Sequence, residues 1–97
     1  MITSKERKKL SGMAQTMEPV FQIGKNGLTD VLIGELSDVL DARELIKVSV
    51  LRNCDDEPRD ILNELCERLN AEPVSCLGGK IVLYRYSKRK DVKHIEL

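Results

Sequence analysis

Residues 20–29 read Val20-Phe21-Gln22-Ile23-Gly24-Lys25-Asn26-Gly27-Leu28-Thr29, and this stretch decides the fold. Its opening β-branched and aromatic side chains favour a β-strand. The two glycines break that strand and permit a tight turn. Thr29 is a good N-cap, and Leu28 can pack against Ile33 across it as a hydrophobic staple. The stretch therefore predicts a strand, a glycine loop and a helix in succession.

The flanking sequence predicts two further helices and three further strands. Thr3 and Glu6 form a capping-box pattern at the start of a helix that carries apolar residues at helical spacing. Gly78 and Gly79 suit a two-residue hairpin turn. The expected elements are a helix over 4–16, a strand over 20–23, a helix over 30–42, a strand over 45–51, a helix from the acidic residues 55–57 and Pro58 to Leu69, and strands over 73–77 and 80–86.

The order α-β-α-β-α-β-β predicts an α/β fold with a mixed four-stranded sheet packed with helices. Helices between successive strands imply parallel pairing and right-handed crossovers, whereas the last two strands form an antiparallel hairpin. A chain of 97 residues is one domain with one core, and no linker or repeat divides it. Residues 87–97 are expected to be a charged, partly disordered tail.

The composition excludes several classes of protein. No apolar run is long enough to span a bilayer, and no secretion signal opens the chain, so we expect no membrane contact and a cytoplasmic location. Three widely spaced cysteines without a Cys-x-x-Cys pair predict reduced thiols, no metal site and no cofactor. A single small core leaves no cleft between lobes, and no nucleophile lies near a base, so we predict that the protein is not an enzyme.

The charges are segregated along the chain although they cancel overall. Residues 1–28 carry a net +3, residues 29–79 a net −7, and residues 80–97 a net +4. A surface with separate poles can attract a polyanion at its basic pole. The charges could equally be solvated faces without a partner, so they favour nucleic acid only in combination with a specific site.

The pattern Gly24-Lys25-Asn26-Gly27 supplies a candidate for that site. Glycines let a polyanion approach the backbone closely, the following helix offers unpaired N–H groups, and Lys25 adds a full positive charge. KH domains clamp nucleotide backbones with a Gly-x-x-Gly loop. The sequence lacks both the P-loop pattern and the dinucleotide-binding glycine pattern.

The same stretch, extended back to Pro19, resembles the signature of the bacterial YhbY family, the stand-alone form of the CRM (chloroplast RNA splicing and ribosome maturation) domain. Further matching blocks are Gly12-Met13-Ala14, Glu44-Leu45-Ile46-Lys47-Val48 and Val82-Leu83-Tyr84-Arg85. The similarity spans roughly residues 3–90. Two positions depart from the family pattern. The hairpin reads Gly78-Gly79-Lys80 where the family tends to have Gly-Lys, so the basic residue is shifted by one, and Tyr86 stands where the family often has Pro.

This resemblance implies RNA binding, association with ribosomal RNA or with precursors of the large ribosomal subunit, and a fold similar to the C-terminal domain of translation initiation factor three. It also implies that RNA contacts come from the glycine loop and nearby basic residues. The expected RNA-binding residues are Gly24, Lys25, Asn26, Gly27, Lys5, Lys8, Lys9, Lys47 and Arg85. We expect Lys5, Lys8 and Lys9 to lie beside the glycine loop.

Several of these residues have an alternative structural explanation. The stem of Lys47 could cover the sheet, and Arg85 could pair with an acidic helix residue. Tyr84 and Tyr86 could stack on bases, although packing in the core is the simpler expectation. The acids at 55–57 are explained by the start of a helix rather than by a bound cation.

The alternative to RNA binding is a protein-interaction module that docks a basic partner on the acidic middle segment. A third possibility, an enzyme acting on a phosphorylated small molecule, has no catalytic pair, metal cluster or P-loop lysine to support it.

Overall fold

The computed structural model describes residues 2–97 and confirms the predicted order of elements. Their bounds are α1 (Ser4–Ala14), β1 (Phe21–Ile23), α2 (Asp30–Arg43), β2 (Leu45–Val50), α3 (Pro58–Leu69), β3 (Glu72–Leu77) and β4 (Lys80–Tyr84). The predicted ends differ most at α1, which ends at Ala14 instead of residue 16, and at β4, which ends at Tyr84 instead of residue 86.

Local signals in the sequence begin each helix. The Thr3 hydroxyl accepts the N–H of Glu6 at 3.1 Å, and the Glu6 carboxylate accepts the N–H of Thr3 at 2.8 Å, which is the predicted capping box. The Thr29 hydroxyl accepts the N–H of Leu32 at 3.1 Å at the start of α2. Pro58 occupies the first turn of α3, where a missing N–H costs nothing.

The sheet has the strand order β1-β2-β4-β3, which differs in one respect from the prediction. β1 and β2 pair in parallel as expected, and β3 and β4 form the expected antiparallel hairpin. The expected parallel pairing of β2 with β3 is wrong, because β4 inserts between them and is antiparallel to both. The physical reason is burial: residues 81–84 of β4 are apolar on both faces and fully covered, and only a central strand is covered on both sides.

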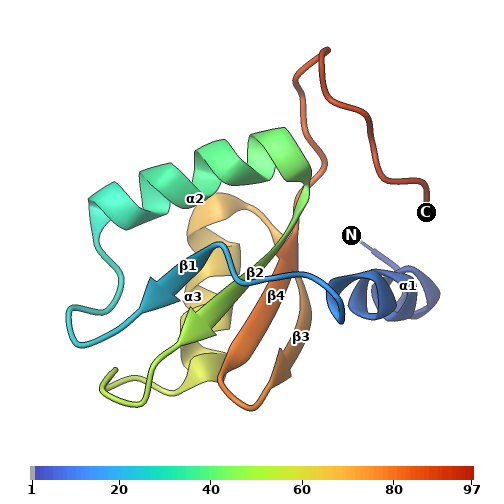
Figure 1. The fold of residues 1–97 in the computed structure, drawn as a ribbon. Coiled ribbons are helices and arrows are strands. Elements are labelled where there is room, and N and C mark those ends of the chain that lie inside the picture. The colour runs from blue at the N-terminus through green and yellow to red at the C-terminus, as the bar shows by residue number, and fades with distance from the viewer. Residues whose placement is uncertain (1) are drawn as a thin grey trace.

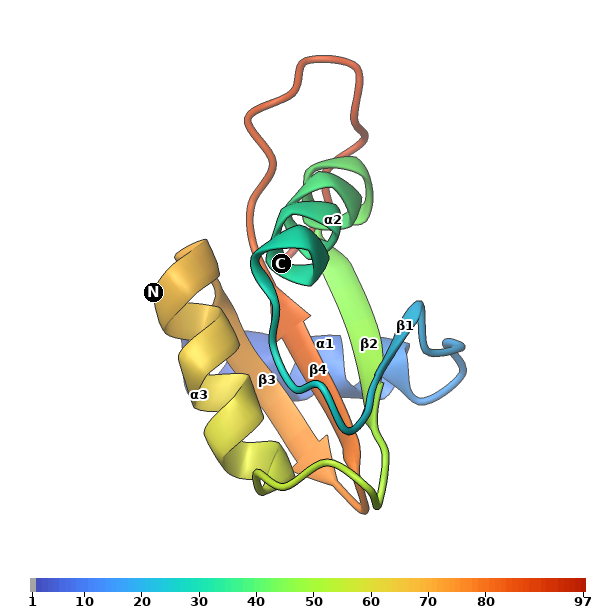
Figure 2. The ribbon, with the colours of Figure 1, turned by 90° about the vertical axis from the view of Figure 1, so that its left-hand side faces the viewer.

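The sheet is covered on both faces, with α2 and α3 packed on one side and α1 on the other (Figures 1 and 2). The larger core lies under α2 and α3 and includes Ile23, Leu36, Leu40, Ile46, Val48, Ile61, Leu65, Ile81 and Leu83. The smaller core lies under α1 and includes Leu10, Ala14, Leu45, Val74, Val82 and Tyr84. Because α1 is short, the remainder of its face carries the polar residues Lys47, Ser49 and Lys80 instead of apolar ones.

The segment after β4 has no helix or strand and rises beyond the end of α2 before it returns towards α1 (Figure 1). Parts of it are nevertheless tied to the body, because Ser87 is buried and Ile95 packs against the smaller core. The partial disorder expected for residues 87–97 stays a prediction.

Tyr84 is a core residue, as the simpler expectation held, whereas Tyr86 is 59% exposed and stacks on His94. The three cysteines are free, and burial together with the nearby Glu72 carboxylate raises the pKa of the Cys66 thiol to about 11. No helix within residues 2–97 is long and apolar enough to cross a membrane.

Candidate nucleic-acid interface

The glycine loop (residues 24–27) is a single tight turn at the end of β1. The Gly27 N–H donates to the Gly24 carbonyl at 2.9 Å, which closes the turn. Lys25 and Asn26 occupy its exposed tip. The loop therefore presents a cation, a side-chain amide and a backbone without side chains to solvent, which is the arrangement that the sequence predicted.

The two glycines of the loop have different surroundings. A Cβ at Gly24 would lie 3.2 Å from the Asn53 Oδ1 and 3.6 Å from the Leu51 side chain, so the exposed Asn53 side chain would have to shift by a few tenths of an ångström to admit one. Gly27 has a φ of +63° with open space around it. Its backbone conformation, and not crowding, favours glycine there.

The start of α2 is less available to an anion than the sequence implied. The Thr29 hydroxyl already satisfies one of the free N–H groups of the first turn. Asp30, whose side chain is 95% exposed, adds a negative charge at the same place and forms an ion pair with Arg68 at 2.8 Å. The positive end of the helix dipole is therefore partly offset, and Lys25 is the principal source of positive charge at the loop.

A second turn, at residues 51–54, lies against the glycine loop and was missed by the sequence reasoning. Leu51 N–H donates to the Ile23 carbonyl at 2.8 Å, and Cys54 N–H donates to the Leu51 carbonyl at 3.0 Å. The turn exposes Arg52 and Asn53. The signal for them was available, because the carboxyl ends of two parallel strands meet at the same edge of a sheet.

Two adjoining grooves run from the exposed sheet face onto α1. The sheet groove, of about 240 Å³, is lined by Ser11, Ala14, Gln15, Lys47, Ser75, Leu77, Lys80 and Val82. The helix groove, of about 530 Å³, is lined by Ser4, Arg7, Lys8, Ser11, Gly12, Gln15 and Val74. Because Ser11 and Gln15 border both, the grooves are continuous. Within the described part of the chain, no acidic side chain lines either one.

The sheet groove places Lys47 where a cation can act. Lys47 is half-buried on the face that α1 leaves open, so its stem covers the sheet while it borders the groove. Lys80 stands beside it and donates to the Ser49 hydroxyl at 3.0 Å. Lys80 was not among the expected RNA-binding residues, since it falls where the sequence departs from the YhbY pattern.

The expectation that Lys5, Lys8 and Lys9 lie beside the glycine loop is wrong. Figures 1 and 2 place α1 and the glycine loop at opposite ends of the molecule. The reason is the packing of α1 on its own face of the sheet, against β2, β3 and β4. Lys5 and Lys8 are exposed, and Lys9 donates to the Glu96 carbonyl at 2.6 Å.

A comparison with protein families identifies the family of this chain. The model of the CRS1 / YhbY (CRM) domain matches residues 2–85. The chain belongs to the CRM family. The match confirms the resemblance that the sequence blocks indicated, and it includes the glycine loop, both grooves and the whole sheet.

Relatives of full length support this membership of the CRM family. The Bacillus subtilis protein named "Probable RNA-binding protein YqeI" is 41% identical over 97 residues, covering 100% of this chain and 99% of the relative. An "RNA-binding protein" of Haemophilus influenzae is 32% identical over 92 residues, covering 95% and 93%. The solution structure of hypothetical protein SAV1595 from Staphylococcus aureus, a candidate RNA-binding protein, has a TM-score of 0.83 and 41% identity, covering 100% of this chain and 99% of that one.

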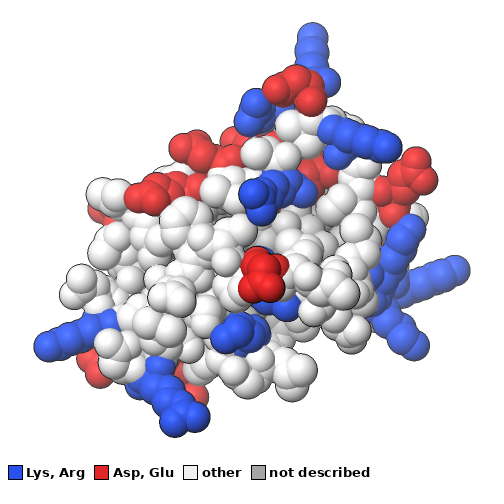
Figure 3. All heavy atoms as spheres, in the orientation of Figure 1, with Lys and Arg blue, Asp and Glu red and all other residues white. Residues whose placement is uncertain are grey.

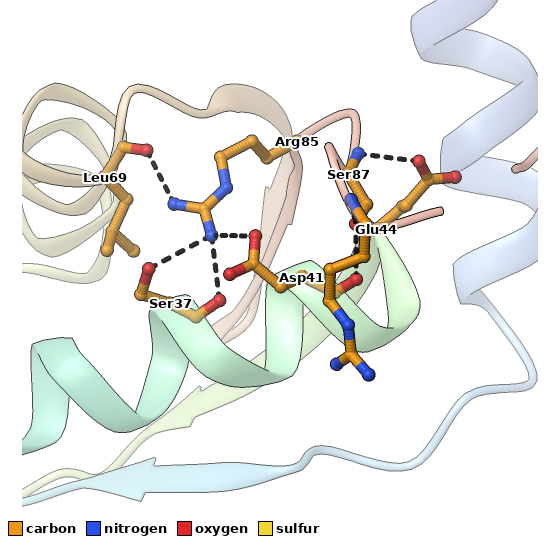
Figure 4. A network of polar contacts seen from close by, with 7 residues as sticks. Ser37, Asp41, Glu44, Leu69, Arg85 and Ser87 are labelled. Atoms are coloured by element: carbon orange, nitrogen blue, oxygen red, sulfur yellow. Dashed lines mark hydrogen bonds and ion pairs between the residues drawn. The ribbon is translucent and has the colours of Figure 1, made fainter. Parts of the chain in front are cut away.

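Arg85 of this CRM domain is engaged inside the protein, as Figure 4 shows. Its guanidinium donates to the Leu69 carbonyl at 3.0 Å, to the Ser37 carbonyl at 2.8 Å and to the Asp41 carboxylate at 2.9 Å. The side chain is only 19% exposed. The structure thus brings Arg85 to the ends of α2 and α3, where it joins the two helices, and not to the glycine loop.

The remaining charges of the CRM domain are divided between its faces. Figure 3 shows acidic side chains gathered over α2, where Asp30, Glu35 and Asp38 are exposed, while the Lys and Arg side chains lie mainly over α1, the C-terminal segment and the end where β1 and β2 finish. No group of three or more His, Cys, Asp or Glu within residues 2–97 could hold a metal ion. The molecule therefore has basic surfaces separated from an acidic ridge.

Proposed function

We propose that this CRM domain binds RNA by holding its ribose-phosphate backbone in the glycine loop. The loop is exposed, and Gly24 and Gly27 leave its backbone open to close approach. Lys25 supplies the charge and Asn26 a side chain that both donates and accepts hydrogen bonds. The names of the relatives as RNA-binding proteins support the class of ligand.

The observation that carries the path of the RNA beyond the loop is that no acidic side chain lines either groove, within the residues described. A strand of RNA that leaves the glycine loop can follow the open sheet face past Lys47 and Lys80 into the sheet groove. It then continues into the helix groove beside Arg7 and Lys8, with Lys5 and Lys9 further along α1. Such a path uses phosphate contacts, which position RNA without specifying its sequence.

We further propose that the bound RNA is ribosomal RNA and that the protein assists assembly of the large ribosomal subunit without catalysing a reaction. The YhbY resemblance supports this role. Arg85 is left out of the RNA path because all of its described contacts are internal.

Ultraviolet crosslinking of the protein to ribosomal RNA, followed by peptide mapping, tests the RNA path. We expect crosslinks at residues 24–27, at Lys47 or Lys80 and along α1, and none on α2. Gradient sedimentation of cell lysate tests the partner: the protein should migrate with a large-subunit particle at low salt and leave it at high salt. Crosslinks confined to α2 would contradict the proposal.

A second candidate function is docking of a basic protein on the acidic ridge over α2. The observation that favours it is the row of exposed acids on a helix that faces away from the basic grooves (Figure 3). Asp38→Lys should then release a ribosomal protein without changing RNA affinity, and Lys25→Ala should do the reverse. Both functions can coexist because they use opposite faces.

A further inference from the structure

A single carboxylate closes the C-terminal segment into a loop. Glu44, the residue that follows α2, accepts the N–H of Ser87 at 2.7 Å and the N–H of Ile95 at 2.8 Å. Its Oε2 also lies 2.7 Å from His94 Nδ1. The chain therefore leaves Glu44 at one end, runs through residues 88–93 (the basic loop) and returns to the same side chain.

The closing contacts are buried. Glu44 is 0% exposed and Ser87 is 1% exposed, and the Ser87 hydroxyl donates to the Asp41 carbonyl at 2.6 Å (Figure 4). Glu44 also has a φ of +68°, a strained backbone conformation for a residue other than glycine. A strained, buried glutamate with three partners in one distant segment is best explained by its function in holding that segment.

Aromatic and apolar contacts support the return of the chain. The Tyr86 and His94 rings stack with centroids 4.2 Å apart and planes 14° from parallel. Ile95 packs against the smaller core, and the Glu96 carbonyl accepts a hydrogen bond from Lys9 of α1 at 2.6 Å. The base of the loop is thus attached to α1, so the basic surface of α1 continues onto the loop.

The basic loop presents mostly unpaired cations. Lys88, Arg89, Lys90 and Lys93 are all exposed, and Figure 3 shows Lys and Arg side chains over this part of the molecule. Arg89 pairs with Asp91 at 2.8 Å. Within residues 2–97, none of the three lysines forms an ion pair. The loop lies beyond residues 2–85, which the CRM domain model matches, so the family match assigns it no role.

We propose that the basic loop is a second RNA-backbone contact and that Glu44 is its positioning residue. This inference rests on the proposed RNA-binding function. Closure by Glu44 orders the loop before RNA arrives, which lowers the entropy cost of binding. The exposed amines match phosphates, and their continuity with α1 places the loop at the far end of the proposed RNA path.

Two charge-matched double variants test the contact. Lys90→Gln with Lys93→Gln should weaken binding of poly(U) about five- to tenfold near 0.1 M salt, and it should lower the log–log salt slope by about 1.4, because each phosphate contact on single strands contributes about 0.7. Arg43→Gln with Arg59→Gln removes the same charge from exposed positions on α2 and α3. Equal affinities and slopes for the two variants would overturn the contact.

The direction in which Glu44→Gln changes the RNA affinity tests the role of Glu44. Glu44→Gln makes the protein more positive, so charge alone predicts tighter RNA binding, whereas an unfastened loop predicts binding about threefold weaker. Glu35→Gln makes the same charge change at an exposed position on α2 and should not weaken binding. In the Lys90→Gln, Lys93→Gln background, Glu44→Gln should no longer weaken binding and should behave like Glu35→Gln, because its weakening action passes through those lysines.

Limited trypsin digestion keeps the inference testable if Glu44→Gln is too unstable for binding assays. Poly(U) should protect the bonds after Lys88, Lys90 and Lys93 in the wild-type protein, and unprotected cleavage would contradict the contact. If Gly27→Asp abolishes RNA binding but the variants at Lys90, Lys93 and Glu44 do not alter it, the basic loop is not an RNA contact and the glycine-loop proposal stands. If the variants at Lys90, Lys93 and Glu44 weaken binding but Gly27→Asp does not, the glycine-loop proposal is wrong and the contact of the basic loop stands. Binding of anionic lipid vesicles in place of poly(U) would overturn both.

Discussion

The glycine loop and the basic loop both present cations to solvent, but they are held by opposite means. The glycine loop closes through a hydrogen bond between Gly27 and Gly24, which are close neighbours in the chain. The basic loop closes on Glu44, which is separated from its three partners by 43, 50 and 51 residues. One depends on backbone freedom at the surface and the other on a buried carboxylate.

This difference predicts that the two regions respond differently to substitution. A change in the glycine loop alters a surface that packs against little, so it should affect RNA binding and leave stability nearly unchanged. A change at Glu44 removes buried contacts that join α2 to the tail, so it should affect stability first. The predictions below set one region against the other.

The largest effect is expected from Glu44→Ala. It leaves the N–H groups of Ser87 and Ile95 without their acceptor, and we expect a loss of about 3 kcal/mol in the free energy of unfolding. Urea denaturation followed by circular dichroism measures it. Asp38→Ala, at an exposed position on α2, should cost less than about 0.5 kcal/mol. Equal losses in the free energy of unfolding for the two variants would show that Glu44 does not hold the C-terminal segment.

A smaller effect should appear on acidification. Burial alone would raise the pKa of the Glu44 carboxyl, but hydrogen bonds from Ser87, His94 and Ile95 together hold that pKa below its ordinary value. A lowered folded pKa contributes stability that is complete above the unfolded pKa of about 4.3 and is lost as the pH falls through the folded pKa. Burial and the nearby Glu44 carboxylate raise the pKa of the Tyr84 hydroxyl, so this group stays protonated in acid.

We therefore expect the wild-type free energy of unfolding to decline below about pH 4, and Glu44→Gln to decline less steeply. Urea titrations at a series of pH values compare the two slopes. The protection of the Ser87 and Ile95 amides against hydrogen exchange, relative to the intrinsic rate at each pH, should fall over the same range in the wild type. Parallel slopes for both proteins would show that Glu44 does not control the acid response.

The sequence was sufficient for the features that depend on near neighbours. The capping box at Thr3 and Glu6, the cap at Thr29 and the turn at Gly78 and Gly79 each involve residues within a few positions of one another. Such contacts leave patterns that are visible in a single sequence. The helices, the strands and the glycine loop were therefore predicted at nearly their observed places.

The sequence was insufficient where distant segments meet. The apolar run of residues 81–84 favours a central place for β4, but it does not specify that β4 inserts between β2 and β3, because the choice of neighbours depends on the finished sheet. Arg85 meets Ser37 across 48 residues, and the distance of α1 from the glycine loop depends on which sheet face α1 covers. In each of these three cases several compact arrangements are consistent with the local sequence preferences, so those preferences do not predict which one forms.

Gly27→Asp should weaken RNA binding about thirtyfold while the fold is kept. Asp tolerates positive φ, and the space around the Gly27 Cβ position is open, but a carboxylate would face the phosphates. Gly27→Asn has nearly the same shape without the charge and should lose far less affinity. Filter binding with ribosomal RNA measures both. Equal losses would indicate crowding instead of charge and would remove the loop from the phosphate contact.

Arg85→Lys should reduce stability by about 1.5 kcal/mol and leave RNA affinity within twofold of the wild type. A lysine ammonium cannot reach the Leu69 carbonyl, the Ser37 carbonyl and the Asp41 carboxylate together, as the forked guanidinium does. Thermal unfolding and filter binding separate the two effects. Loss of RNA binding without loss of stability would restore Arg85 to the RNA path.

The smallest effect is expected from Lys25→Ala, because an exposed lysine contributes one screened charge and few packing contacts. Binding should weaken about threefold near 0.1 M salt, and the log–log salt slope should fall by about 0.7–0.9 if the amine neutralises one phosphate. Arg59→Ala, equally exposed but on α3, removes the same charge and should leave the slope unchanged. The slope is the sharper measurement, since it counts phosphate contacts at a place where the affinity change alone is close to experimental error. If Lys25→Ala and Arg59→Ala share the wild-type slope, the Lys25 amine contacts no phosphate, and any phosphate contact of the glycine loop must come from its backbone.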